Sequence, residues 1–174
     1  MAIQAGTYEF GPDTASLQVE TTRSGAAAKA GHDLLIDVNS WSATLEVGDS
    51  SSLELSADST SLHVREGKGG MQALKDDDME DIRKTIDKDV LKKKDIVFKS
   101  SSCEPAGDAI KVSGDLEMGG KSKPVSFEVS ESGGKFTGSA TLKQSDWGIK
   151  PYSALFGALK VNDEVRVVFE GTPA

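Results

Sequence analysis

IKVSGDLEMGGKSKPVSFEV, residues 110–129, is the stretch of sequence that decides the fold. Apolar side chains occupy every second position over residues 110–118 and again over residues 125–129. This alternation predicts two β-strands, each with one apolar face. Because the two runs are separated only by Gly119–Lys121 and the short segment that follows, we expect them to pair as a hairpin.

The same alternation recurs along the rest of the chain, and Gly133–Gly134 predicts a second hairpin. Counted together, these runs give about eight or nine strands joined mostly by short turns. The other runs are Leu17–Thr21, Leu34–Val38, Trp41–Val47, Leu53–Ala57, Ile96–Phe98, Phe136–Leu142 and Val165–Phe169. Half-apolar strands in this number must close into a barrel or stack as a sandwich to cover their apolar faces.

An eight-stranded barrel has an interior that is either filled by side chains or able to hold one small ligand. Several positions expected to face inward carry small residues, namely Ala43, Ala57, Gly114, Gly138 and Ala140. Small residues also occur at barrel corners, so the pattern has two interpretations. The first of them predicts an interior that the protein's own side chains do not fill.

Residues 75–94 interrupt the strand pattern. Their apolar positions, Met79, Ile82, Ile86 and Val90, are three or four residues apart and predict one inserted α-helix with a single apolar stripe. Acidic residues at its start and lysines at its end suit the helix dipole. Such a helix is either a lid across a barrel mouth or a helix packed on the outside.

Composition excludes several classes of partner. The chain has 174 residues, the usual size of one domain, with a formal net charge of −8 and 6% aromatic residues. An acidic chain with few aromatics is a poor binder of nucleic acid, and no segment predicts a membrane-spanning helix. The first ten residues lack the pattern of a secretory signal, so we expect a cytoplasmic protein.

No motif for catalysis or for metal binding stands out. Cys103 is the only cysteine, and the two histidines, His32 and His63, are not at a metal-ligand spacing. No serine lies in a Gly-x-Ser-x-Gly elbow. His32 beside Asp33 is the one titratable pair worth noting, and it either orients a polar head group or simply ends a strand. The sequence predicts no enzyme, no cofactor and no metal.

Residues 145–161, SDWGIKPYSALFGALKV, form the most unusual segment. This long connection is rich in apolar side chains but has no clean period. It either packs over the barrel end as core or lines the entrance for an apolar ligand. The apolar residues in question are Trp147, Ile149, Tyr152, Leu155, Phe156 and Leu159.

Four stretches resemble the YceI-like family of polyisoprenoid-binding proteins. They are GTYEFGPDTASLQVET, AGHDLLIDV, GDLEMGGKSKPVSFEVS and QSDWGI, and the resemblance runs from Gly6 to Phe169. Its most specific parts are Lys123-Pro124-Val125 and the run Ser145–Ile149. The stretch HVREGKGGMQALKDDD, before the helix, departs from the common family pattern.

The resemblance implies one lipocalin-like, eight-stranded antiparallel β-barrel domain over residues 1–174, with the helix inserted and commonly a homodimer. It also implies an isoprenoid or fatty-acyl amphiphile inside the barrel. We expect His32 and Arg65 to contact the polar head of this ligand. We expect Trp147, Tyr152, Leu155 and Phe156 at the rim or floor. Ile149 and Leu159 are the remaining predicted ligand-binding residues.

Three hypotheses about function follow. The first is a carrier that sequesters or transports a long-chain amphiphile, with binding driven by apolar burial at about 0.8 kcal/mol per methylene. The second is a stress-response or protein-interaction module with a fully packed barrel, and an interior without a cavity would favour it. The third is a lipid-modifying enzyme, which would need titratable groups converging inside the barrel.

Overall fold

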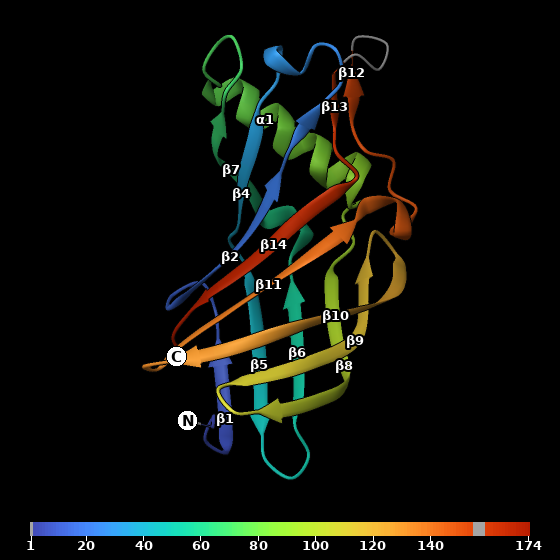
Figure 1. Cartoon of the computed structure of the whole chain (residues 1–174). Coiled ribbons are helices and arrows are strands. Elements are labelled where there is room, and N and C mark those ends of the chain that lie inside the picture. The colour runs from blue at the N-terminus through green and yellow to red at the C-terminus, as the bar shows by residue number, and fades with distance from the viewer. Residues whose placement is uncertain (1, 155–158) are drawn as a thin grey trace.

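The computed structural model describes residues 2–154 and 159–174 and consists mainly of antiparallel β-strands with one α-helix (Figure 1). Within these residues the main sheet has the strand order β1-β5-β6-β8-β9-β10-β11-β14-β2-β4-β7, and it curls round on itself. Its strands are β1 (Gly6–Phe10), β2 (Ala15–Thr21), β4 (Asp33–Val38), β5 (Trp41–Val47), β6 (Ser52–Ala57), β7 (Leu62–Lys68), β8 (Ile96–Ala106), β9 (Ala109–Met118), β10 (Lys121–Ser132), β11 (Lys135–Lys143) and β14 (Glu164–Gly171). A small second sheet has the order β12-β13-β3, with β12 (Ser153–Ala154), β13 (Leu159–Val161) and β3 (Arg23–Ser24).

The predicted count of eight strands is not confirmed, since the main sheet has eleven in the described part of the chain. Three runs of chain are each broken into two strands: β1 and β2, β4 and β5, and β6 and β7. Each broken run still pairs with a single neighbouring run along its whole length. The run of β1 and β2 pairs with the run of β4 and β5, because β1 pairs with β5 and β2 pairs with β4. Likewise β5 pairs with β6 while β4 pairs with β7. The breaks let long strands bend, and the bends help the sheet to curl.

Both predicted hairpins are confirmed. β9 pairs with β10 across Gly119–Gly120, and β10 pairs with β11 across Gly133–Gly134. The φ angles of these four glycines lie between 60° and 87°. Two consecutive residues with positive φ define the tight turn whose twist matches that of paired strands, and glycine adopts this conformation without steric cost.

The predicted helix is present but shorter than residues 75–94. The α-helix α1 (Asp76–Thr85) continues into one π-helical turn, η3 (Ile86–Val90). A short loop then connects η3 to β8. The helix crosses the upper half of the molecule in Figure 1 and lies against β7. Among the described helices, none is both long and apolar enough to cross a membrane.

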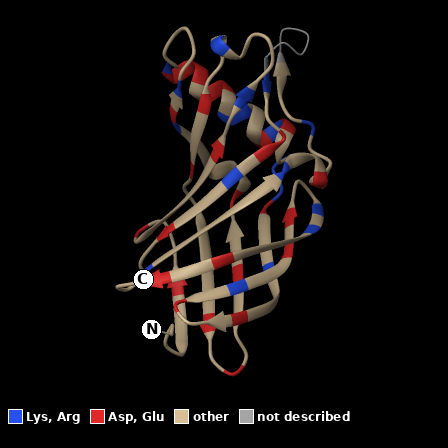
Figure 2. Cartoon of the chain, viewed as in Figure 1, with Lys and Arg blue, Asp and Glu red and all other residues tan. Residues whose placement is uncertain are grey.

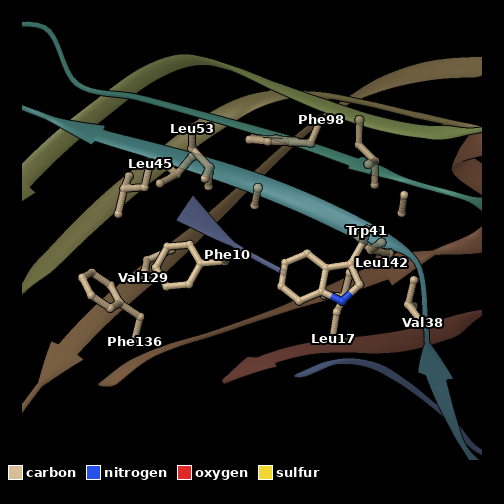
Figure 3. Close-up of a cluster of buried hydrophobic side chains, with 14 of the residues drawn as sticks. Phe10, Leu17, Val38, Trp41, Leu45, Leu53, Phe98, Val129, Phe136 and Leu142 are labelled. Carbon is tan, nitrogen blue, oxygen red and sulfur yellow. The ribbon is translucent and has the colours of Figure 1, made fainter. Parts of the chain in front are cut away.

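One end of the curled sheet is filled by side chains. Ile3, Val47, Ile110, Val112 and Phe136 are all buried there, before β1, at the end of β5 and near the starts of β9 and β11. These ends of the strands lie toward the two chain termini in Figure 1. We call the region that these five residues fill the closed end. Part of this core, with Phe136 beside Val129, is drawn in Figure 3.

A bulge in the β8–β9 ladder depends on a glycine. The pairing shifts register between Ser100 and Ser102, and Gly114 of β9 lies opposite Ser100. A Cβ atom at Gly114 would lie 2.2 Å from the backbone oxygen of Lys99 and 2.6 Å from the Cα of Ser100. Because backbone atoms cannot swing aside as a flexible side chain can, only glycine fits at this position.

We therefore expect Gly114→Ala to lower the free energy of unfolding by about 2–3 kcal/mol, as overpacking of a tight site does. Gly48→Ala is the matched control, because a Cβ at Gly48 would meet no atom within 4 Å. That control should change stability by less than about 0.5 kcal/mol. Urea unfolding of both variants measures the difference, and equal stabilities would contradict the role given to Gly114.

Candidate ligand-binding cavity

The curled sheet and the helix surround a cavity of about 560 Å³ with a mostly apolar lining. Alternate residues of the strands point into it, as the sequence pattern predicts; Leu17 and Val19 of β2 and Val165 and Val167 of β14 are examples. The interior is thus filled at the closed end and hollow beyond it. A volume of this size is ordinary for a small-molecule site, which typically measures 300–1,000 Å³.

Small side chains account for part of the empty space. Ala43, Ala57, Gly138 and Ala140 all line the cavity, so four of the five small inward positions singled out in the sequence leave room there. Gly114 is the exception, since its place is set by the close approach of β8 and not by the cavity.

The helical segment forms one wall of the cavity. Ile82 and Thr85 of α1, and Ile86 and Val90 of η3, face the cavity, and Leu91 is buried just beyond them. Met79, the first residue of the predicted stripe, does not line it. Of the two alternatives for the helix, the structure therefore supports a cover over the cavity.

The charged lining residues gather where the cavity meets solvent, together with His32 and Tyr152. Tyr152 lines the cavity although 54% of it is exposed, and Lys160 and Asp81 are exposed lining residues as well. Arg23 and His32 line the same region and are half-buried. We call the surface formed by these five residues the mouth. Its charges are mixed, and acidic and basic residues also alternate along the ribbon of the whole chain in Figure 2.

His32 and Arg23 are both held by backbone oxygens. Nε2 of His32 lies 2.6 Å from the carbonyl oxygen of Gln72, in the loop that leads to α1. Nη1 of Arg23 donates to the carbonyl oxygens of Gly31 and Lys68, at 2.5 and 2.9 Å. These contacts tie β3, the start of β4 and the end of β7 together at the mouth. Arg23 was missed by sequence reasoning, because a single arginine after a strand carries no distinguishing pattern.

His32 and Asp33, the one titratable pair noted in the sequence, make separate contacts. Oδ1 of Asp33 accepts the backbone N–H of Arg23 at 2.9 Å, while the ring of His32 turns to Gln72. His32 comes directly before β4 and Asp33 begins it, and the two side chains turn to different partners. Among the described residues, no group of three or more His, Cys, Asp or Glu side chains is arranged to hold a metal ion.

Other predicted site residues take different places. Ile149 is buried and lines the cavity. Arg65 does not line it: the side chain is exposed on β7 and pairs with Asp37 at 2.8 Å, and these hydrogen bonds raise the pKa of Arg65. Its expected contact with a ligand head is therefore not supported by its position, because Arg65 does not line the cavity while Leu62 of the same strand does.

Three further predicted residues follow β12 in the sequence. Leu155 and Phe156 are outside the described residues, and of Leu159 only the backbone, at the start of β13, is described. Their predicted contact with a ligand stays a prediction.

Trp147 belongs to the core and not to the rim. It is 4% exposed, is not among the cavity-lining residues, and donates its indole N–H to the carbonyl oxygen of Leu116 at 2.8 Å. It lies in the short 3-10 helix η4 (Gln144–Trp147), which packs against β10. The ladder between β10 and β11 ends at Glu128 and Ser139, so η4 covers the place where these two strands separate.

We predict that Trp147→Phe lowers the free energy of unfolding by about 1–2 kcal/mol, since the buried carbonyl of Leu116 loses a donor. Ligand affinity should change less than about twofold, or about 0.4 kcal/mol, because the ring is not part of the cavity wall. Urea unfolding and a titration with a fatty acid measure the two effects. If the variant is folded but no longer binds the fatty acid, Trp147 contributes to ligand binding and the prediction is wrong.

Asp163 fastens η4 from the other side. Its carboxylate accepts the backbone N–H of Ser145 at 2.8 Å and the Ser145 hydroxyl at 2.5 Å. These donors stabilise the charged form and lower the pKa of Asp163 below its ordinary 3.8. A carboxyl group whose pKa is lower in the folded state stabilises the fold above the unfolded pKa. That contribution is lost as the pH falls through the folded pKa.

The fold should therefore lose part of the Asp163 contribution on acidification, and Asp163→Asn, which mimics the protonated group, should remove that part of the pH dependence. Urea unfolding at neutral pH and at a pH below the ordinary aspartate range gives the comparison. The wild-type chain should lose more stability between the two conditions than the variant does. Identical losses would mean that the Ser145 contact does not stabilise the folded state.

Comparisons with known proteins agree with this architecture. A family model described as "YceI-like domain" matches residues 8–172. The crystal structure of BcnA from Burkholderia cenocepacia is similar, with a TM-score of 0.60 and 19% identity over 88% of this chain and 94% of that chain. A Campylobacter jejuni YceI protein gives a TM-score of 0.55 and 14% identity over 78% and 81% of the two chains. A search of curated protein sequences finds no match. At these identities the solved structures show a shared fold.

Proposed function

The chain belongs to the YceI-like domain family, and from this premise we propose that it binds one long-chain amphiphilic lipid, of the polyisoprenoid or fatty-acyl type, inside the curled sheet. We also propose that it carries or sequesters this lipid without changing it chemically. The family is associated with hydrophobic ligands. One mutant CJ YceI protein, 14% identical over 78% of this chain and 81% of that one with a TM-score of 0.58, is described with a monobromobimane guest structure.

The observation that supports the proposal best is the shape and chemistry of the cavity. It is about 560 Å³ in volume and mostly apolar, and its charged lining residues, Arg23, Asp81 and Lys160, belong to the mouth. An amphiphile would bind with its chain inside and its head group at the mouth, beside His32. Each buried methylene contributes about 0.8 kcal/mol to binding, so a long chain needs few polar contacts.

The two competing hypotheses receive less support. A protein-interaction module with a packed barrel predicts an interior without a cavity, and this interior has one. A lipid-modifying enzyme needs catalytic groups that converge on the reacting atoms. His32 and Asp33, the only pair that the sequence offered, bind separate backbone groups.

The first test is native mass spectrometry of gently purified protein, followed by extraction and identification of any lipid. We expect a single long-chain lipid at one copy per chain. A protein that purifies without lipid, and that also takes up neither a fatty acid nor an isoprenoid alcohol on incubation, would contradict the proposal.

A pair of glutamine substitutions tests the location of the lipid. Ile86→Gln places an amide in the apolar wall, and an amide without a partner costs about 1–3 kcal/mol, which lowers affinity roughly 5- to 150-fold. Lys84→Gln is the control, because Lys84 is exposed on α1 and is not among the residues that line the cavity. Titration with a fluorescent fatty acid should weaken for the first variant alone.

The cytoplasmic location and the homodimer expected from the sequence stay predictions. Neither follows from the curled sheet or from its cavity. The ligand-binding role of the individual lining residues is part of the proposal and rests on their position.

A further inference from the structure

We propose that Phe10 and Phe169 set the length of the chain that the cavity accepts, and thereby restrict the ligand to a single chain of moderate length. This inference rests on the proposed function and narrows its ligand class. It follows from how the boundary between the closed end and the hollow part of the molecule is built.

Five aromatic side chains form a continuous row across the interior. The ring centroids are 5.1 Å apart between Tyr8 and Phe136, 5.2 Å between Phe136 and Phe10, 5.1 Å between Phe10 and Phe169, and 5.9 Å between Phe169 and Trp41. Figure 3 shows Phe10 between Phe136 and Trp41. Only Phe10 and Phe169 line the cavity. Tyr8 and Phe136 lie on the closed-end side of Phe10, and Trp41 packs against Phe169 without lining the cavity, so Phe10 and Phe169 form the floor.

The floor is held firmly in place. Phe10 meets Phe136 at 70° and Phe169 at 88°, and Phe169 meets Trp41 at 86°. These are edge-to-face contacts, the arrangement that aromatic pairs favour. The rings come from four different strands, β1, β5, β11 and β14. A ligand chain that pushed against the floor would have to displace several packed rings together, and tightly packed interiors resist this.

The volume above the floor sets an approximate chain length. At about 30 Å³ per heavy atom, the volume of one water molecule in the liquid, a cavity of 560 Å³ holds roughly 19 heavy atoms. The charged groups lie at the mouth, so the head group stays there and the chain points toward the floor. A fatty acyl chain or an isoprenoid of about 20 carbons fits this space. A much longer polyisoprenoid would leave part of its chain in water.

The experiment measures the affinity of the full chain for two homologous series, unbranched fatty acids from decanoate to docosanoate and the matching primary alcohols. Each methylene that enters the cavity should raise affinity about fourfold, from about 0.8 kcal/mol per methylene. For the wild-type chain the increase should stop near octadecanoate or eicosanoate. The point at which affinity stops rising is the quantity compared between variants.

Phe169→Leu and Phe10→Leu replace a floor ring by a smaller side chain and so deepen the cavity. In these variants affinity should continue to rise for at least two more carbons of chain length than in the wild-type chain. Phe136→Leu is the matched control, because it removes the same atoms from the same aromatic row but lies behind the floor. It should lower stability without moving the point. Circular dichroism verifies that each variant is folded.

A substitution that makes the cavity shorter provides a second test, which does not depend on whether the floor variants fold. Ala140 lines the cavity on β11 opposite Val167, one inward position nearer the mouth than Gly138, which pairs with Phe169. Ala140→Leu adds side-chain volume above the floor. It should therefore move the point to shorter chains, with affinity for the longest fatty acids reduced at least fourfold, the value of one methylene.

The outcomes separate this inference from the proposed function. If the wild-type chain binds both series but neither the floor variants nor Ala140→Leu moves the preferred length, the role of Phe10 and Phe169 is overturned and the carrier function stands. If the wild-type chain binds no member of either series and no isoprenoid alcohol, the proposed function fails, and the length limit fails with it.

Discussion

The structure depends on one constraint: each strand of the main sheet has a single apolar face, and every such face must be kept from water. The chain meets this constraint by curling the sheet so that the apolar faces look at one another. Bends between β1 and β2, β4 and β5, and β6 and β7 allow the curvature. The amphipathic helix α1 covers part of the interior that the strands leave open, with its own apolar stripe turned inward.

The interior that results is divided by side-chain size. Large residues fill the closed end, and the aromatic row from Tyr8 to Trp41 bounds it. Beyond this row Ala43, Ala57 and Ala140 stand where larger residues would meet across the sheet, and the space stays empty. Packed interiors seldom tolerate such space without a use, since lining atoms lose contacts on one side. A bound chain would restore these contacts.

The wall of this cavity is completed by polar interactions as well as by packing. The QSDWGI segment covers the place where β10 and β11 separate, with Trp147 bonded to the backbone of Leu116 and Ser145 held by Asp163. This explains why a polar run, Ser145 and Asp146, stands beside two buried apolar residues, Trp147 and Ile149. One face of the segment is fastened to the sheet, and Ile149 reaches the cavity.

Alternation and turn chemistry are local properties, so the sequence by itself determined most strands, both glycine hairpins, the helix and the small inward residues. The resemblance of its motifs indicated the family before any fold was known. Tertiary structure alone decided which side chains reach the cavity. Arg65 and Arg23 look alike in sequence, yet one faces outward to Asp37 and the other faces the mouth. Strand breaks, bulges and the meeting of distant rings such as Phe10 and Phe169 depend on contacts between remote segments, which no local pattern encodes.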